Sequence, residues 1–119
     1  MKMLGSMLLP IVIVLAMLVS AAFGGEKDTE RDPIIIDVRT EAEWATGHVE
    51  GAVLIPYEQI GESIIQVTAD RKAKIYLYCR TGRRTAIAAD TLKRGGYENL
   101  INLETVENAS KVLNRSVVK

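Results

Sequence analysis

Residues 74–96, KIYLYCRTGRRTAIAADTLKRGG, decide the fold of this chain. Residues 74–78, apolar after Lys74, are typical of a buried strand, since β-branched and aromatic side chains favour the extended backbone. Residues 85–94 are rich in alanine, a strong helix former, and the glycine pair at residues 95–96 is typical of a helix end. The segment therefore predicts a strand, a short polar loop and a helix, in that order.

Other strand and helix patterns lie on both sides of this segment. Residues 34–38 form a continuous β-branched run, as expected for a strand that is buried on both faces. Thr40 and Glu43 have the spacing of a helix capping box, and Gly47 is placed to end that short helix. The remaining predicted elements are strands at residues 52–55 and 100–103 and helices at residues 57–67 and 106–113. This alternation predicts an α/β domain of three layers, with a mainly parallel central sheet flanked by helices.

Composition and charge narrow the range of functions. The chain has 119 residues, 48% of them hydrophobic and 25% charged, which is ordinary for one globular domain. Its 15 basic and 15 acidic side chains cancel, so we expect no nucleic-acid partner. A single cysteine excludes a disulfide within the chain and every multi-cysteine metal site, and we expect no metal and no cofactor. Residues 63–119 nevertheless carry 11 basic and 5 acidic side chains, a local field that favours a small anionic substrate.

The first 24 residues predict a secretory signal peptide. A short basic start precedes an apolar run at residues 7–19. The small residues after this run are compatible with cleavage after Ala22 or Gly24. The expected location is the periplasm or the cell exterior, with no stable membrane association once the signal is removed. The alternative is a retained membrane anchor, because the apolar segment extended to Phe23, residues 7–23, is just long enough to span a bilayer. The predicted divisions are a signal peptide at residues 1–24, a linker at 25–32 and a folded domain at 33–119.

The only cysteine, Cys79, lies directly after the predicted strand and just before the predicted helix. Ligands of parallel α/β sheets bind beyond the carboxyl ends of strands, where helix N-termini present free N–H groups. With Gly82 at positive φ, the loop would turn successive N–H groups onto the sulfur, and Thr85 suits the helix N-cap. These groups and the loop arginines would lower the pKa of the thiol and make it reactive. The alternative is an inert cysteine in the core.

Two separated motifs carry a family resemblance. The first joins Asp37-Val38-Arg39 and Glu43-Trp44 to residues 47–52, GHVEGA, and then to Ile55-Pro56. The second is residues 79–85, CRTGRRT, which fits the pattern Cys-x-x-Gly-x-x-Ser/Thr. With these motifs, the chain resembles a single-domain rhodanese, or thiosulfate sulfurtransferase, of the small exported type. The resemblance implies the rhodanese-like form of the three-layer α/β fold.

The resemblance also implies a ping-pong sulfur transfer through Cys79. Its thiolate would attack the outer sulfur of thiosulfate or another sulfane-sulfur donor, and the persulfide would pass that sulfur to cyanide, a small thiol or a protein thiol. Asp37 and Arg39 are expected to form a supporting ion pair, while His48 has a packing role and Trp44 lies in the core. The implied substrate-binding residues follow the cysteine in its loop: Arg80, Thr81, Gly82, Arg83, Arg84 and Thr85.

Three other functions use a reactive cysteine in a similar loop. A phosphatase or arsenate reductase needs an arginine six positions after the cysteine, where this chain has Thr85. Redox sensing through a disulfide would lack a resolving cysteine. A persulfide carrier or partner-binding module with little thiosulfate turnover remains an open alternative. The chain also departs from the family at residues 104–106, ETV, where a Gly-Gly turn is common, so the pocket wall and the substrate stay open.

Overall fold

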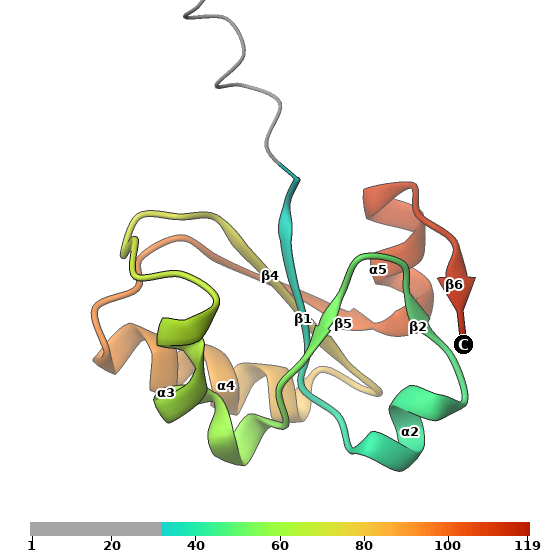
Figure 1. The fold of residues 1–119 in the computed structure, drawn as a ribbon, viewed down its shortest axis with the longest axis horizontal. Coiled ribbons are helices and arrows are strands. Elements are labelled where there is room, and N and C mark those ends of the chain that lie inside the picture. The colour runs from blue at the N-terminus through green and yellow to red at the C-terminus, as the bar shows by residue number, and fades with distance from the viewer. Residues whose placement is uncertain (1–31) are drawn as a thin grey trace, which may run out of the picture. The chain divides into compact units, whose positions relative to one another are not determined.

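The computed structural model describes residues 32–119 (Figure 1). The predicted signal peptide at residues 1–24 lies outside the described residues, as does the predicted linker at residues 25–32 except for Asp32. In the part of the chain that the structure describes, no helix is long and apolar enough to cross a membrane.

A four-stranded parallel sheet forms the centre of the fold, in the order β3-β1-β4-β5. Its strands are β1 (Ile34–Asp37), β3 (Val53–Leu54), β4 (Ile75–Cys79) and β5 (Leu100–Thr105). The parallel sheet and its four strands confirm the sequence prediction. β5 continues two residues further than predicted, because it runs directly into the helix that follows it.

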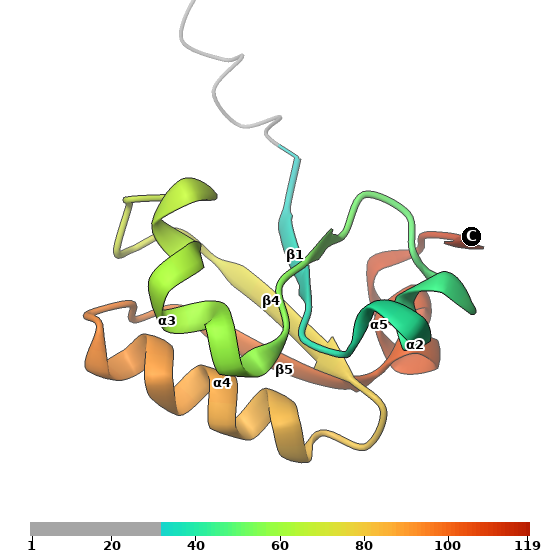
Figure 2. The ribbon, with the colours of Figure 1, turned by 60° about the horizontal axis from the view of Figure 1, so that its bottom comes forward.

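Helices cover both faces of this sheet (Figure 2). α3 (Ile60–Ser63) and α4 (Arg83–Arg94) pack on one face, and α5 (Val106–Leu113) packs on the other. The fold therefore has the predicted three layers. The remaining elements are α2 (Glu41–Ala45) and a small antiparallel sheet of β2 (His48–Val49) with β6 (Val117–Val118). This second sheet was not predicted, since two-residue strands show no sequence periodicity.

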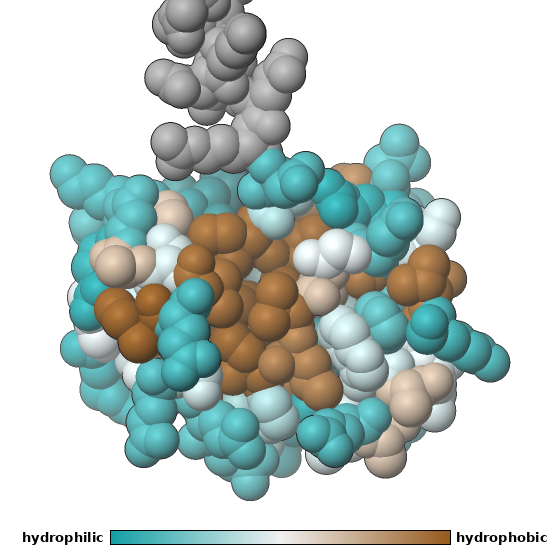
Figure 3. All heavy atoms as spheres, viewed as in Figure 1, coloured by the Kyte–Doolittle hydropathy of each residue, from teal (hydrophilic) through white to brown (hydrophobic). Residues whose placement is uncertain are grey.

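One edge of the central sheet is short and partly apolar. The edge strand β3 has two residues, and Val53 in it is 43% exposed. Figure 3 shows apolar side chains gathered on the face of the molecule where β1 and β3 lie in Figure 1. An edge of two residues presents few free backbone groups to another strand.

Alternate residues of each central strand point to opposite faces and divide the core in two. Ile36, Leu77 and Cys79 belong to the buried cluster that α3 and α4 cover. Ile35 and Tyr78 belong to the cluster on the side of α5. Because both faces of β1 are dry, this strand is apolar without interruption until its last residue.

The predicted helix at residues 57–67 is broken into shorter pieces. Its buried face is as predicted, since Ile60 and Ile64 are both buried. Glycine is a weak helix former, and Gly61 lies where α3 approaches α4 so closely that a Cβ would be 3.1 Å from Thr91 Cγ2. The segment consists of a 3-10 turn (Tyr57–Gln59), α3 and a second 3-10 turn (Ile64–Gln66).

Helices α2 and α5 each begin after a threonine whose side chain caps the first turn. The capping box of α2 is confirmed: the Glu43 backbone N–H donates to Thr40 Oγ1 at 3.2 Å, and the Thr40 N–H donates to the Glu43 carboxylate at 3.1 Å. α5 covers the predicted residues 106–113, and Thr105 caps it by accepting the Asn108 N–H at 3.0 Å. Capping therefore determines where both helices begin.

A buried ion pair between Asp37 and Arg39 ends β1, as predicted. The guanidinium donates to the carboxylate at 2.7 Å and to the carbonyl oxygen of Gly47 at 2.7 Å, so the pair also holds the chain that follows α2. Burial alone would lower the pKa of Arg39, but the hydrogen bond and the charge of Asp37 raise it. Each charge is thus buried only because the other one accompanies it.

Asp37→Asn tests this pair. The substitution keeps the shape of the side chain but leaves the Arg39 charge buried without a counter-charge, so we expect a loss of about 3–5 kcal/mol in the free energy of unfolding, measured by urea denaturation. Asp90→Asn is the matched control, because the Asp90–Arg94 pair lies on the surface of α4 and such pairs contribute about 0.3–0.5 kcal/mol. Equal losses in the two variants would contradict a structural role for the buried pair.

Candidate active site

Cys79 is the last residue of β4, and only three residues separate it from α4. The chain reverses at Gly82, whose φ of 96° is the predicted left-handed conformation. This turn brings the Gly82 N–H to 3.0 Å from Cys79 Sγ, to which it donates a hydrogen bond. Helix α4 then begins at once, with Arg83 as its first residue.

The predicted N-cap at Thr85 is wrong. Gly82 occupies the cap position, and Thr85 lies in the first turn of α4, fully buried. The helix begins two residues earlier than predicted because a glycine at positive φ lets the chain enter the helix without an extended cap residue. Thr85 Oγ1 is buried, and apart from the Cys79 sulfur it has no hydrogen-bond partner among the described residues. Its hydroxyl is therefore available to the sulfur.

Cys79 has a lowered pKa although its side chain is fully buried. Burial raises the pKa of the thiol. Hydrogen bonds from the Thr85 hydroxyl and from the backbone N–H groups of Thr85, Thr81 and Gly82 outweigh burial and lower it. An inert core cysteine would be buried in the same way. The groups around Cys79, however, stabilise a thiolate.

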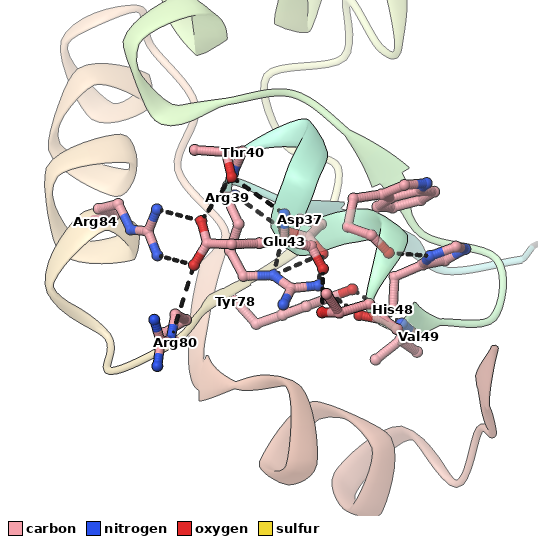
Figure 4. Close-up of polar contacts among 12 residues, drawn as sticks. Asp37, Arg39, Thr40, Glu43, His48, Val49, Tyr78, Arg80 and Arg84 are labelled. Atoms are coloured by element: carbon pink, nitrogen blue, oxygen red, sulfur yellow. Dashed lines mark hydrogen bonds and ion pairs between the residues drawn. The ribbon is translucent and has the colours of Figure 1, made fainter. Parts of the chain in front are cut away.

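The three loop arginines lie in different surroundings. Arg84 forms a two-pronged ion pair with Glu43, at 2.8 and 2.9 Å, and Figure 4 shows this guanidinium facing the carboxylate. Arg80 approaches Glu43 only to 3.8 Å, and 71% of its side chain is exposed. Arg83 is exposed at the start of α4. Arg80 and Arg83 are therefore the arginines with charge open to a ligand in solution.

Glu43 was not predicted to contact the loop. The hydrogen bond from Arg84 is the main cause that lowers the pKa of Glu43 to about 2, with Thr40 adding to it against the effect of burial. The same carboxylate thus caps α2 and holds Arg84 of α4. The capping box identified Glu43 as a helix-start residue, but no local pattern connects it to an arginine 41 positions away.

An open pocket of about 460 Å³ lies beside the loop, lined by Arg39, Ala42, Glu43, Thr46 and Arg80. It gives a small molecule access to the exposed side of Arg80. Among residues 32–119, no group of three His, Cys, Asp or Glu side chains is placed to hold a metal ion.

His48 and Trp44 pack against each other. Their rings are stacked with centroids 3.4 Å apart, and His48 Nδ1 lies 3.1 Å from the Trp44 carbonyl oxygen. Trp44 is half-buried, so its predicted place in the core is wrong: α2 has no buried residue, and the indole covers the imidazole instead. These contacts agree with a packing role for His48.

Comparison with known proteins points to one family. Residues 23–105 match the model of the Rhodanese-like domain. A solved structure of a rhodanese with anions from E. coli has a TM-score of 0.66 and 27% sequence identity, covering 74% of this chain and 99% of that chain. The family match spans the whole central sheet and the cysteine loop, rather than one motif.

Curated relatives from bacteria are similar over parts of their length. The thiosulfate sulfurtransferase PspE of Escherichia coli is 33% identical over 67 residues, which are 56% of this chain and 64% of PspE. The probable adenylyltransferase/sulfurtransferase MoeZ of Mycobacterium tuberculosis is 39% identical over 79 residues, 65% of this chain and 20% of MoeZ. The putative sulfur carrier protein YrkF of Bacillus subtilis is 32% identical over 82 residues, 69% of this chain and 43% of YrkF. The chain thus spans a fifth to somewhat under two thirds of the length of these relatives.

The role of the Thr85 hydroxyl is testable through the pKa of Cys79. The thiolate is the form that reacts with iodoacetamide, so the alkylation rate falls as the pH drops through the pKa. In the wild type we expect this midpoint below the value of about 8.5 for an ordinary cysteine. Thr85→Val removes one donor while keeping the shape, and we expect the midpoint to rise.

Thr81→Val is the matched control, because Thr81 supplies only its backbone N–H to the sulfur. The midpoint in this variant should stay at the wild-type value. A Thr85→Val midpoint that also stays there would contradict the hydrogen bond from the hydroxyl.

Proposed function

Because this chain belongs to the rhodanese-like domain family of sulfurtransferases, we propose that it moves sulfane sulfur from thiosulfate to a thiophilic acceptor through a persulfide on Cys79. The observation that carries the proposal is the set of donors around the sulfur. The Gly82 N–H lies 3.0 Å from Sγ, and the Thr81 and Thr85 N–H groups also lower the thiol pKa. The same donors would hold the terminal sulfur of a persulfide anion.

The first half-reaction needs no group beyond these residues. The Cys79 thiolate attacks the outer sulfur of thiosulfate, the S–S bond of the donor breaks, and its electron pair leaves with sulfite. A persulfide anion then remains on Cys79, so one negative charge stays at the loop. Arg80 and Arg83 would attract thiosulfate and steady the departing sulfite, since both side chains are exposed beside the loop.

The second half-reaction regenerates the thiolate. A thiophilic acceptor, such as cyanide, a small thiol or a protein thiol, attacks the outer sulfur of the persulfide, and the S–S bond breaks toward Cys79. The open pocket beside Arg80 would admit the acceptor. Glu43 would keep Arg84 away from that path by holding its guanidinium.

A persulfide carrier is the second candidate. Its support is the similarity to YrkF, which is named a putative sulfur carrier protein. Such a domain would use the same thiolate and the same N–H donors, but a partner protein would load it. The two candidates therefore differ in how fast free thiosulfate loads Cys79.

Intact mass of the reduced domain, before and after thiosulfate, tests the proposal. We expect a gain of one sulfur atom that cyanide removes as thiocyanate, and no gain in Cys79→Ser. Failure to gain sulfur in a protein whose Cys79 is still alkylated at neutral pH would exclude thiosulfate as donor and favour the carrier. Failure of both reactions would contradict any catalytic role for Cys79.

We also propose that the domain is exported, on the basis of the signal-like residues 1–24. N-terminal sequencing of the full chain, expressed in a bacterium and recovered from the periplasmic fraction, should show a start after Ala22 or Gly24. An intact Met1 in the membrane fraction would indicate a retained anchor instead.

A further inference from the structure

β5 contains one extra residue where it passes the cysteine loop. Leu77 of β4 pairs with Asn102, but the next pair along the sheet is Cys79 with Thr105, so three steps on β5 match two on β4. Glu104 lies within this bulge and has a φ of 70°. Bulges beside active sites redirect side chains, and a left-handed glutamate is strained, because its Cβ is crowded in that conformation.

The bulge brings the Glu104 side chain against the cysteine loop. A Cβ built on Gly82 would lie 3.1 Å from Glu104 Cγ and 3.5 Å from its carboxylate Oε2. Gly82 is the residue whose N–H donates to Cys79 Sγ. The exposed Glu104 side chain thus lies against the residue that donates to the sulfur.

Asn102 holds this arrangement from both sides. Its Oδ1 accepts the Glu104 backbone N–H at 2.9 Å, and its Nδ2 donates to the Gly82 carbonyl oxygen at 3.3 Å. One side chain therefore links the bulge to the loop. Glu104 is kept beside Gly82 although its backbone conformation is unfavourable.

The Glu104 charge is not compensated by an ion pair. Across residues 32–119, ion pairs form at Asp37, Glu43 and Asp90, and none forms at Glu104. Glu43 meanwhile compensates Arg84. The net positive charge that the loop presents to a sulfur donor is therefore much smaller than its three arginines suggest.

We propose that Glu104 is a specificity-determining residue that disfavours donors in proportion to their negative charge. The inference rests on the proposed sulfur transfer and deepens it. Thiosulfate brings two negative charges to a site that already holds the Cys79 thiolate, and the carboxylate adds repulsion to each of them. The basic loop alone would favour a dianionic donor. With Glu104 beside it, the site favours sulfane-sulfur donors that carry one negative charge or no charge.

Two donors with the same reacting group test this charge dependence. Thiosulfate is a dianion that releases sulfite, and methanethiosulfonate is a monoanion that releases methanesulfinate, each delivering its outer sulfur to the thiolate. Loading rates follow from intact mass in quenched time courses. In Glu104→Gln, which keeps the shape and the backbone strain, we expect thiosulfate loading to rise about threefold to tenfold. Methanethiosulfonate loading should rise by about the square root of that factor, since it carries half the charge.

Glu98→Gln is the matched control. It makes the same substitution on an exposed residue just before β5, at the end of the strand away from the cysteine, and should change neither rate. Equal gains for both donors in Glu104→Gln, or no gain for either, would overturn the proposal. A rise in Glu98→Gln equal to that in Glu104→Gln would assign the effect to net charge and would also overturn it.

Alkylation separates this proposal from the proposed function. If the wild type gains sulfur from neither donor, the sulfur transfer is contradicted, and the charge dependence is then read from iodoacetate, an anion, against neutral iodoacetamide. Glu104→Gln should raise the ratio of the iodoacetate rate to the iodoacetamide rate about twofold or more. An unchanged ratio would overturn the role of Glu104, whatever the donor experiments show.

Discussion

Helix α4 begins directly after β4 because Gly82 adopts a left-handed backbone, and the site depends on that conformation. A side chain at this position would be strained by the positive φ and would press on Glu104. The short loop turns the N–H groups of Thr81, Gly82 and Thr85 toward a sulfur that lies in the core. Without these donors, burial would raise the pKa of Cys79 and keep it protonated. The backbone geometry of the loop, together with the Thr85 hydroxyl, therefore stabilises the thiolate form of a buried cysteine.

The surrounding fold holds the neighbours of the loop in place through polar contacts between segments. Arg39 binds Asp37 and the Gly47 carbonyl oxygen, which joins the end of β1 to the chain beyond α2. Tyr78, next to the cysteine, accepts the Val49 N–H at 3.0 Å and so ties β4 to β2. Together with the Glu43–Arg84 pair, these contacts keep α2 beside the start of α4 (Figure 4). Two of these residues, Arg39 and Glu43, also line the open pocket.

Local patterns account for most of what was predicted correctly. A strand buried on both faces must be apolar throughout, which identified β1, and the capping box identified the start of α2. The ion pair of Asp37 with Arg39 joins residues two positions apart, so it too was visible in the sequence. The errors arose where tertiary contacts override propensity. Close packing at Gly61 accompanies the broken helix, and Gly82 in place of Thr85 caps α4.

The sequence by itself determined the parallel α/β fold, the family and the place of the only cysteine between a strand and a helix, because each follows from short motifs along the chain. Only the tertiary structure decided the charge around that cysteine. Glu43 and Arg84 are 41 positions apart, and Glu104 reaches Gly82 only through the bulge in the pairing of β4 with β5. Such contacts depend on strand order and register, which no local periodicity encodes. In the sequence, the charged residues of the loop are all basic. In the folded protein, the carboxylates of Glu43 and Glu104 lie beside it.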